Sequence, residues 1–121
     1  MLSQAQTFHL KDKDTMPGLR VRLKNPDSTP HDLTGATSVT LHVRIKATGE
    51  IFSRPMTIED VTGGIVIYAW QAEDWTDTTT ALEVGLHQME YEVLGPGAAR
   101  LTFPNAGHDE LSIIDDLGQQ T

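Results

Sequence analysis

The stretch from Ser38 to Lys46 alternates without interruption between polar and apolar residues. Residues two apart share one face of a strand, whereas on a helix they lie about 200° apart around the axis. This spacing therefore gives a single apolar face only in an extended chain. It predicts a half-buried β-strand whose inward residues are Val39, Leu41, Val43 and Ile45.

Other stretches with the same period, or with a short apolar run, predict further strands. Together the expected strands lie at 7–10, 19–24, 38–46, 51–58, 65–70, 85–94, 99–103 and 111–114. The core is expected to hold, besides the four residues above, Leu19, Val21, Leu23, Val66, Tyr68, Met89, Tyr91 and Val93. Pro55 lacks the N–H group that a central ladder needs, so its strand is expected at a sheet edge or at a bulge.

No segment has long helical periodicity, and only 72–75 could form a helical turn. Turn-forming residues recur about every ten residues, which is typical of a β-sandwich or a β-barrel. The length of 121 residues fits one domain, 1–121, with a polar tail at 116–121.

Composition excludes several kinds of site. The chain has no cysteine, so disulfides, thiolate metal sites and cysteine nucleophiles are excluded. Neither a membrane span nor a secretory signal is expected, because no apolar run is long enough and the start lacks a cationic segment followed by an apolar one. The net charge of −8 argues against a nucleic-acid partner.

The charges are unevenly distributed along the chain. Residues 1–54 hold eight Lys/Arg and five Asp/Glu, whereas residues 55–121 hold one Lys/Arg and twelve Asp/Glu. Two interpretations are open. Either the two halves interleave and their charges pair across strands, or the molecule has a bipolar surface suited to head-to-tail contact with copies or partners.

Catalytic and metal-binding chemistry finds little support. No nucleophile motif such as Gly-x-Ser-x-Gly is present, and no two histidines have ligand spacing. His87 lies in the inward phase of its strand and is expected to be packed and hydrogen-bonded, whereas His42 lies in the outward phase and is expected in solvent. We therefore expect no catalytic residue, no cofactor and no metal.

Neighbouring acids occur four times in the second half of the chain: Glu59-Asp60, Glu73-Asp74, Asp109-Glu110 and Asp115-Asp116. None of these pairs has the alternating spacing of a calcium loop, so they are expected to be solvated turn acids. The last two pairs are nevertheless candidates for contact with a basic partner: Asp109, Glu110, Asp115 and Asp116.

The two tryptophans lead to different expectations. Trp70 ends a predicted strand and is expected in the core, where strand tryptophans are most often found. Trp75 lies in the least strand-like segment, 71–82, and is a candidate for an exposed contact with a partner. With Tyr68, the two indole rings could instead form a platform on which a sugar stacks.

The order of four motifs is informative. They are His31–Ala36, which contains Asp-Leu-Thr-Gly-Ala before a strand, then Ile58–Trp70, Gly85–Val93 and Leu101–Asn105. In this order the chain resembles the immunoglobulin-like domain of tailed-bacteriophage virion proteins, in particular the N-terminal domain of the baseplate upper protein family. The resemblance spans about residues 7 to 115.

The resemblance implies an all-β, immunoglobulin-like antiparallel β-sandwich of seven to eight strands. It also implies a non-enzymatic structural component of the virion, located in the tail or baseplate, the neck or the head surface. Such a protein assembles in the host bacterial cytoplasm with other virion structural proteins, as a homo-oligomer or in many copies. The alternative is a carbohydrate-binding or adhesion module on a phage or bacterial surface.

The motifs are interpreted as scaffold. Asp32 is expected to accept from backbone donors in its turn, and Gly35 and Gly63 are expected to take positive φ.

In a sandwich of this type, strands 38–46 and 85–94 are expected to be antiparallel neighbours in one sheet. Their outward faces would then coincide and bring opposite charges together. The side chains expected to meet are His42, Arg44 and Lys46 on one strand and Gln88, Glu90 and Glu92 on the other.

Overall fold

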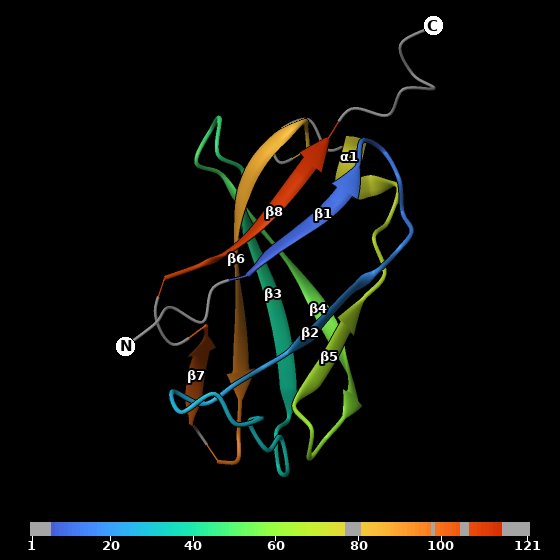
Figure 1. Cartoon of the computed structure of the whole chain (residues 1–121). Coiled ribbons are helices and arrows are strands. Elements are labelled where there is room, and N and C mark those ends of the chain that lie inside the picture. The colour runs from blue at the N-terminus through green and yellow to red at the C-terminus, as the bar shows by residue number, and fades with distance from the viewer. Residues whose placement is uncertain (1–5, 77–80, 98, 105–106, 115–121) are drawn as a thin grey trace, which may run out of the picture.

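A computed structural model describes residues 6–76, 81–97, 99–104 and 107–114 of the chain. The fold is all-β, as the sequence predicts, with one helical turn between two of its strands (Figure 1). The elements are β1 (Thr7–Lys11), β2 (Leu19–Arg22), β3 (Ser38–Arg44), β4 (Ile51–Asp60), β5 (Ile65–Tyr68), α1 (Glu73–Thr76), β6 (Gly85–Leu94), β7 (Arg100–Phe103) and β8 (Asp109–Ile114).

The strands form one mixed sheet in the order β1-β8-β6-β3-β4-β5-β2, with β7 also paired to β6. The sheet curls until it is nearly closed into a barrel (Figure 1). β1 runs parallel to β8, and all other pairs are antiparallel. The parallel pair differs from the purely antiparallel sandwich that the resemblance implies.

β4 changes partners halfway along its length. Its first part, 51–56, pairs with β3, and its last part, 57–60, pairs with β5, with a register shift between Ile58 and Asp60. The sequence predicted either an edge strand or a bulge at Pro55. β4 is instead an interior strand, and its register shift lies beyond Pro55.

The place of Pro55 explains this difference. Ile45 N–H donates to Glu50 O at 2.8 Å at the start of the β3–β4 ladder. Because bonding positions alternate along an antiparallel pair, Pro55 falls where the backbone points away from β3. It also precedes the part of β4 that pairs with β5. Its missing N–H therefore costs no ladder bond.

The core lies inside the curled sheet. All twelve residues that the alternation predicts to be inward are buried, and Leu41 and Val43 are fully inaccessible. Trp70 and His87 are buried as expected. Further apolar side chains complete the core: Leu10, Leu33, Phe52, Met56, Leu82, Phe103, Leu111 and Ile113.

Two turns show how the motif glycines act. Asp32 accepts from Thr34 N–H at 2.8 Å, and Gly35 has a φ of 83°, both as expected. The positive φ expected at Gly63 lies instead at Gly64, whose φ is 68°. A Cβ on Gly64 would come within 2.6 Å of His31 O and 2.8 Å of Leu23 O. Glycine is therefore required at position 64, because the backbone of Leu23 and His31 leaves no room for a Cβ there.

Candidate functional site

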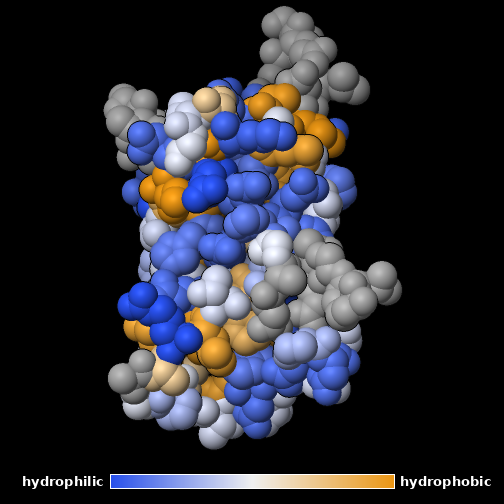
Figure 2. Space-filling model, turned by 90° about the vertical axis from the view of Figure 1, so that its left-hand side faces the viewer, coloured by the Kyte–Doolittle hydropathy of each residue, from blue (hydrophilic) through white to orange (hydrophobic). Residues whose placement is uncertain are grey.

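A connected set of polar side chains crosses the outer face of β4, β3, β6 and β7. His42 lies within 2.7 Å of Ser53 Oγ through Nδ1 and within 2.8 Å of Glu92 Oε1 through Nε2. The other carboxylate oxygen of Glu92 accepts from Arg100 Nε at 2.7 Å. We call Ser53, His42, Glu92 and Arg100 the polar belt. Figure 2, a view onto the side on which Figure 1 places β7, shows hydrophilic groups across the middle of the molecule with hydrophobic ones above and below.

The polar belt tests the expected pairing of β3 with β6. The two strands are antiparallel neighbours, as predicted. The acid that pairs across them is Glu92, and its partner is His42. His42 was expected to be in solvent, but it is half-buried. Arg44 lies opposite the neutral Gln88, and it lines a hollow of about 30 Å³ together with Glu90. The pairing of the strands and the meeting of His42 with Glu92 were thus predicted, whereas Arg44 has a neutral residue opposite it.

The order Ser53, His42, Glu92 matches the nucleophile, base and acid of an acyl-transfer site. Such a site also needs two N–H donors aimed at a developing oxyanion and room for a substrate. Here the three residues lie within paired strands. The backbone N–H groups of a strand point sideways toward its neighbours, and not outward to the face on which these side chains lie. The neighbouring hollow of about 30 Å³ has room for about one water molecule. The arrangement suits cross-linking of strands better than catalysis.

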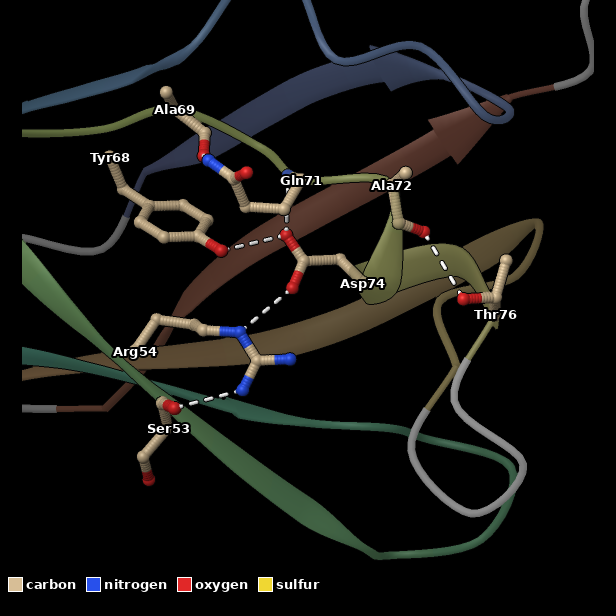
Figure 3. Close-up of polar contacts among 8 residues, drawn as sticks. All are labelled: Ser53, Arg54, Tyr68, Ala69, Gln71, Ala72, Asp74 and Thr76. Atoms are coloured by element: carbon tan, nitrogen blue, oxygen red, sulfur yellow. Dashed lines mark hydrogen bonds and ion pairs between the residues drawn. The ribbon is translucent and has the colours of Figure 1, made fainter.

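Asp74 forms the centre of a buried polar cluster beneath α1 (Figure 3). Its carboxylate accepts from Arg54 Nε at 2.9 Å, Tyr68 OH at 2.8 Å and Gln71 N–H at 2.8 Å. Burial, followed by the bond to Asp74, raises the pKa of Tyr68 above its ordinary value. The expectation that Asp74 is a solvated turn acid is wrong. α1 directs the carboxylate inward, where three donors compensate for the loss of water.

A hollow of about 400 Å³ opens beside this cluster, where β4 and β5 diverge. Two side chains cap backbone carbonyls near it. Arg54 Nη1 donates to Ser53 O at 3.0 Å, and Gln71 Nε2 donates to Ala69 O at 2.8 Å. These bonds occupy acceptors that an added strand would use, so the gap in the sheet is stabilised without a partner.

Asp109, a candidate for partner contact, is buried and not on the surface. It accepts from Tyr91 OH at 2.8 Å and from Gln6 N–H at 2.8 Å. Burial raises the pKa of Asp109 above its ordinary value, although the bonds from Gln6 and Tyr91 oppose this shift. A signal was present in the sequence, because Asp109 shares the phase of the inward residues Leu111 and Ile113.

The other predicted contact residues have mixed outcomes. Trp75 is only 9% exposed and belongs to the core, so its predicted surface role is wrong. α1 turns the indole inward, and Nε1 has no hydrogen-bond partner among the described residues. Glu110 is exposed and accepts from Thr7 Oγ1 at 3.2 Å. Asp115 and Asp116 lie outside the described residues, as does the expected tail at 116–121.

A sugar platform is not formed by the aromatic side chains. Trp70 and Tyr68 pack edge to face in the core, with ring centroids 5.2 Å apart. All seven aromatic residues of the chain are described, and none of them is exposed. The stacking surface that the sequence suggested is therefore absent from this set.

Sequence reasoning missed an exposed apolar group at one end of the sheet. It consists of Val84, Leu86 and Ile114, which we call the apolar patch. Gly85 pairs with Ile113. Val84, just before β6, therefore lies opposite Ile114, the last residue of β8, and Leu86 lies close to both on β6. Alternation could have found Leu86 and Ile114, because both fall in the outward phase of their strands.

The ranges that the structure describes hold neither a cluster of metal ligands nor a membrane-spanning helix. No three His, Asp or Glu side chains there are grouped so as to hold a metal ion. No helix within those ranges is long and apolar enough to cross a bilayer.

No protein-family model matches the chain, and no curated protein matches its sequence. Among solved structures, the chain is similar to the N-terminal domain of phage TP901-1 ORF48. The TM-score is 0.55 at 11% sequence identity, and the match covers 91% of this chain and 84% of the other. At this identity the similarity shows a shared fold.

Proposed function

We propose that this chain is a non-enzymatic structural component of a tailed-bacteriophage virion that acts by assembly with other virion proteins. The observation that carries the proposal is the fold, which the chain shares over most of its length with a domain of a phage protein. An immunoglobulin-like type of fold, a place in the tail, baseplate, neck or head surface, and assembly in the host cytoplasm belong to the same proposal.

The distribution of polar groups supports a structural role. Asp74 and Asp109 are buried and bonded to donors from the chain itself, as expected of groups that hold elements together. The polar belt and the apolar patch lie on the outside of paired strands. Surfaces of this shape suit contact with another protein better than enclosure of a small substrate.

The proposal is tested on particles of the phage that encodes the chain. The particles are purified on a density gradient, and the chain is sought by mass spectrometry and by immunogold labelling. We expect it in a fixed ratio to the capsid protein, while a host cytoplasmic protein, the control, is lost. Recovery of the chain only from the soluble lysate would overturn the proposal, as would a hydrolase activity that Ser53→Ala removes.

A further inference from the structure

Among the described strands, β1, β2 and β7 each have one neighbour and one unpaired edge. The inner faces of β1 and β2 are covered, because their inward side chains are buried or half-buried: Phe8, Leu10, Leu19 and Val21. On β7, Leu101 pairs with Val93 and shares its face of the sheet, but Val93 is buried and Leu101 is 44% exposed. β7, at the side of the sheet next to β6 (Figure 1), therefore carries an uncovered apolar side chain on its inner face.

The core ends between two residues of β7. Phe103 is buried, and the ring of His31 packs on it with the ring centroids 4.9 Å apart. Leu101 lies two residues earlier on the same face, and its exposure shows that the core does not extend over it. A strand added beside β7 would bring side chains against Leu101 and extend the core.

The free edge of β7 presents the backbone groups of Arg100 and Thr102. Gly95 N–H donates to Ala99 O at 2.8 Å where the β6–β7 hairpin closes. Because bonding positions alternate along an antiparallel pair, Leu101 exchanges backbone bonds with β6. The N–H and C=O groups of Arg100 and Thr102 then point away from β6. They form the kind of open edge to which another strand can bond.

We infer that two copies of this chain pair through β7, antiparallel and about a twofold axis, so that the sheet continues from one copy into the other. Arg100 of each copy exchanges backbone bonds with the partner's Thr102. Leu101 packs against the partner's Leu101 on the inner face. The contact is self-complementary, because the same surface serves in both copies, and it closes at a dimer.

The residues of β7 favour one register. With Leu101 opposite the partner's Leu101, every edge-facing N–H and C=O group of Arg100 and Thr102 has a backbone partner. A shift of two residues in one direction sets Arg100 opposite the partner's Arg100, which brings like charges together. The same shift in the other direction sets Arg100 opposite the partner's Pro104, which has no N–H to donate.

Charge also favours β7 over β2 as the edge that pairs with a copy. Leu23 N–H donates to Gly64 O at 2.7 Å, so the backbone groups of Arg20 and Arg22 face the free edge of β2. An antiparallel copy would set these arginines opposite each other. On β7 the single charged residue is Arg100, and Glu92 of the same copy already pairs with it at 2.7 Å.

This inference deepens the proposed function by naming another copy as a partner, and it rests on that function only for its setting. A strand of four residues makes a small contact, so association of the free protein is expected to be weak and to depend on concentration. Each copy has a net charge of −8, so association is best measured at physiological salt, which screens the repulsion between copies.

The first test uses a single introduced cysteine, which reports one contact because the chain has none of its own. In the proposed pair, the two Leu101 residues occupy a non-hydrogen-bonded position, where Cα atoms lie about 4.5 Å apart and a disulfide can form. We expect Leu101→Cys to give a disulfide-linked dimer under mild oxidation about tenfold faster than Leu86→Cys, measured on non-reducing gels. Leu86 is the control because it is 40% exposed but lies on β6, which has neighbours on both sides. Equal or faster cross-linking of Leu86→Cys would overturn the inference.

The second test is sedimentation velocity over a wide concentration range, with circular dichroism to confirm folding. Thr102→Pro removes an N–H group at the free edge without removing a bond within the chain, and we expect it to weaken association by about tenfold or more. Arg22→Pro makes the same change at the free edge of β2 and is expected to associate like the unmodified chain. An unmodified chain that stays monomeric at the highest concentration, or an equal loss in both proline variants, would contradict pairing through β7. Neither result affects detection of the chain in particles, which tests the proposed function separately.

Discussion

Tyr91 donates a hydrogen bond of 2.8 Å to Asp109 Oδ2, and both side chains are buried. The bond joins the middle of β6 to the start of β8. The other oxygen of Asp109 accepts from Gln6 N–H, immediately before β1. One carboxylate thus holds three neighbouring segments at the edge of the sheet.

Tyr91→Phe removes one of the donors to Asp109 and leaves that oxygen buried. We expect the free energy of unfolding to fall by about 1–3 kcal/mol, the usual cost of an unsatisfied buried polar group. Urea denaturation followed by circular dichroism measures the change. Glu110→Gln, at an exposed neighbouring position, is the control and is expected to stay within about 0.5 kcal/mol.

Asp109 also predicts a pH dependence. Burial raises the pKa of Asp109 in the folded protein above its ordinary value of 3.8, so the folded state holds this proton more tightly than the unfolded state. The stabilisation is complete below about pH 3.8 and is lost as the pH rises through the raised pKa. Asp109→Asn has no such titration, and the Tyr91 hydroxyl can rotate to accept from the new amide.

Unfolding free energies of the two proteins should therefore be measured from pH 3 to 7. We expect the unmodified chain to lose stability relative to Asp109→Asn as the pH rises. A difference that is constant over this range would show that the carboxyl group titrates alike in both states. Because the same exposed acids are present in both proteins, their contributions cancel in the comparison.

Leu41→Ala tests the centre of the core. Leu41 is fully inaccessible and lies in β3, between the pairs that this strand makes with β4 and β6. Removal of its side chain leaves a cavity, and we expect a loss of about 2–5 kcal/mol by urea denaturation. Leu101→Ala, at an exposed position on β7, is the matched control. A loss below about 0.5 kcal/mol at Leu41 would contradict its central place.

The alternation of residues predicted the inward faces because side-chain direction has a period of two in any strand. It did not predict that β4 pairs with β3 along its first part and with β5 along its last part. The alternation in 51–60 is the same whether or not the strand changes neighbours. Nor could it place Trp75, since one turn of helix is too short to show a period. Alternation placed His42 on the same outer face as Glu90 and Glu92, but it did not show which of the two acids bonds to His42, because that choice depends on rotamers across the sheet.

The cluster around Asp74 is expected to act as a unit. Asp74→Ala leaves the Arg54 guanidinium and the Tyr68 hydroxyl without their acceptor, so we expect a loss of about 3–5 kcal/mol. Arg54→Met alone leaves the carboxylate without its cation and should also be costly. The double variant removes both charges and is expected to lose clearly less than the sum of the single losses. Additive losses would mean that the two charges do not depend on each other.

Trp75 distinguishes a core role from a surface role. Its indole Nε1 has no hydrogen-bond partner among the residues that the structure describes, so replacement by another ring removes apolar contact but no polar bond. We expect Trp75→Phe to cost about 1 kcal/mol, within the usual range for a point substitution. Trp75→Ala is expected to cost about 3–5 kcal/mol, because it leaves a large cavity beneath α1. Both are measured by urea denaturation. If Trp75 were instead a surface contact, both variants would keep the full stability of the chain, and the alanine variant would lose only the binding of a partner or glycan.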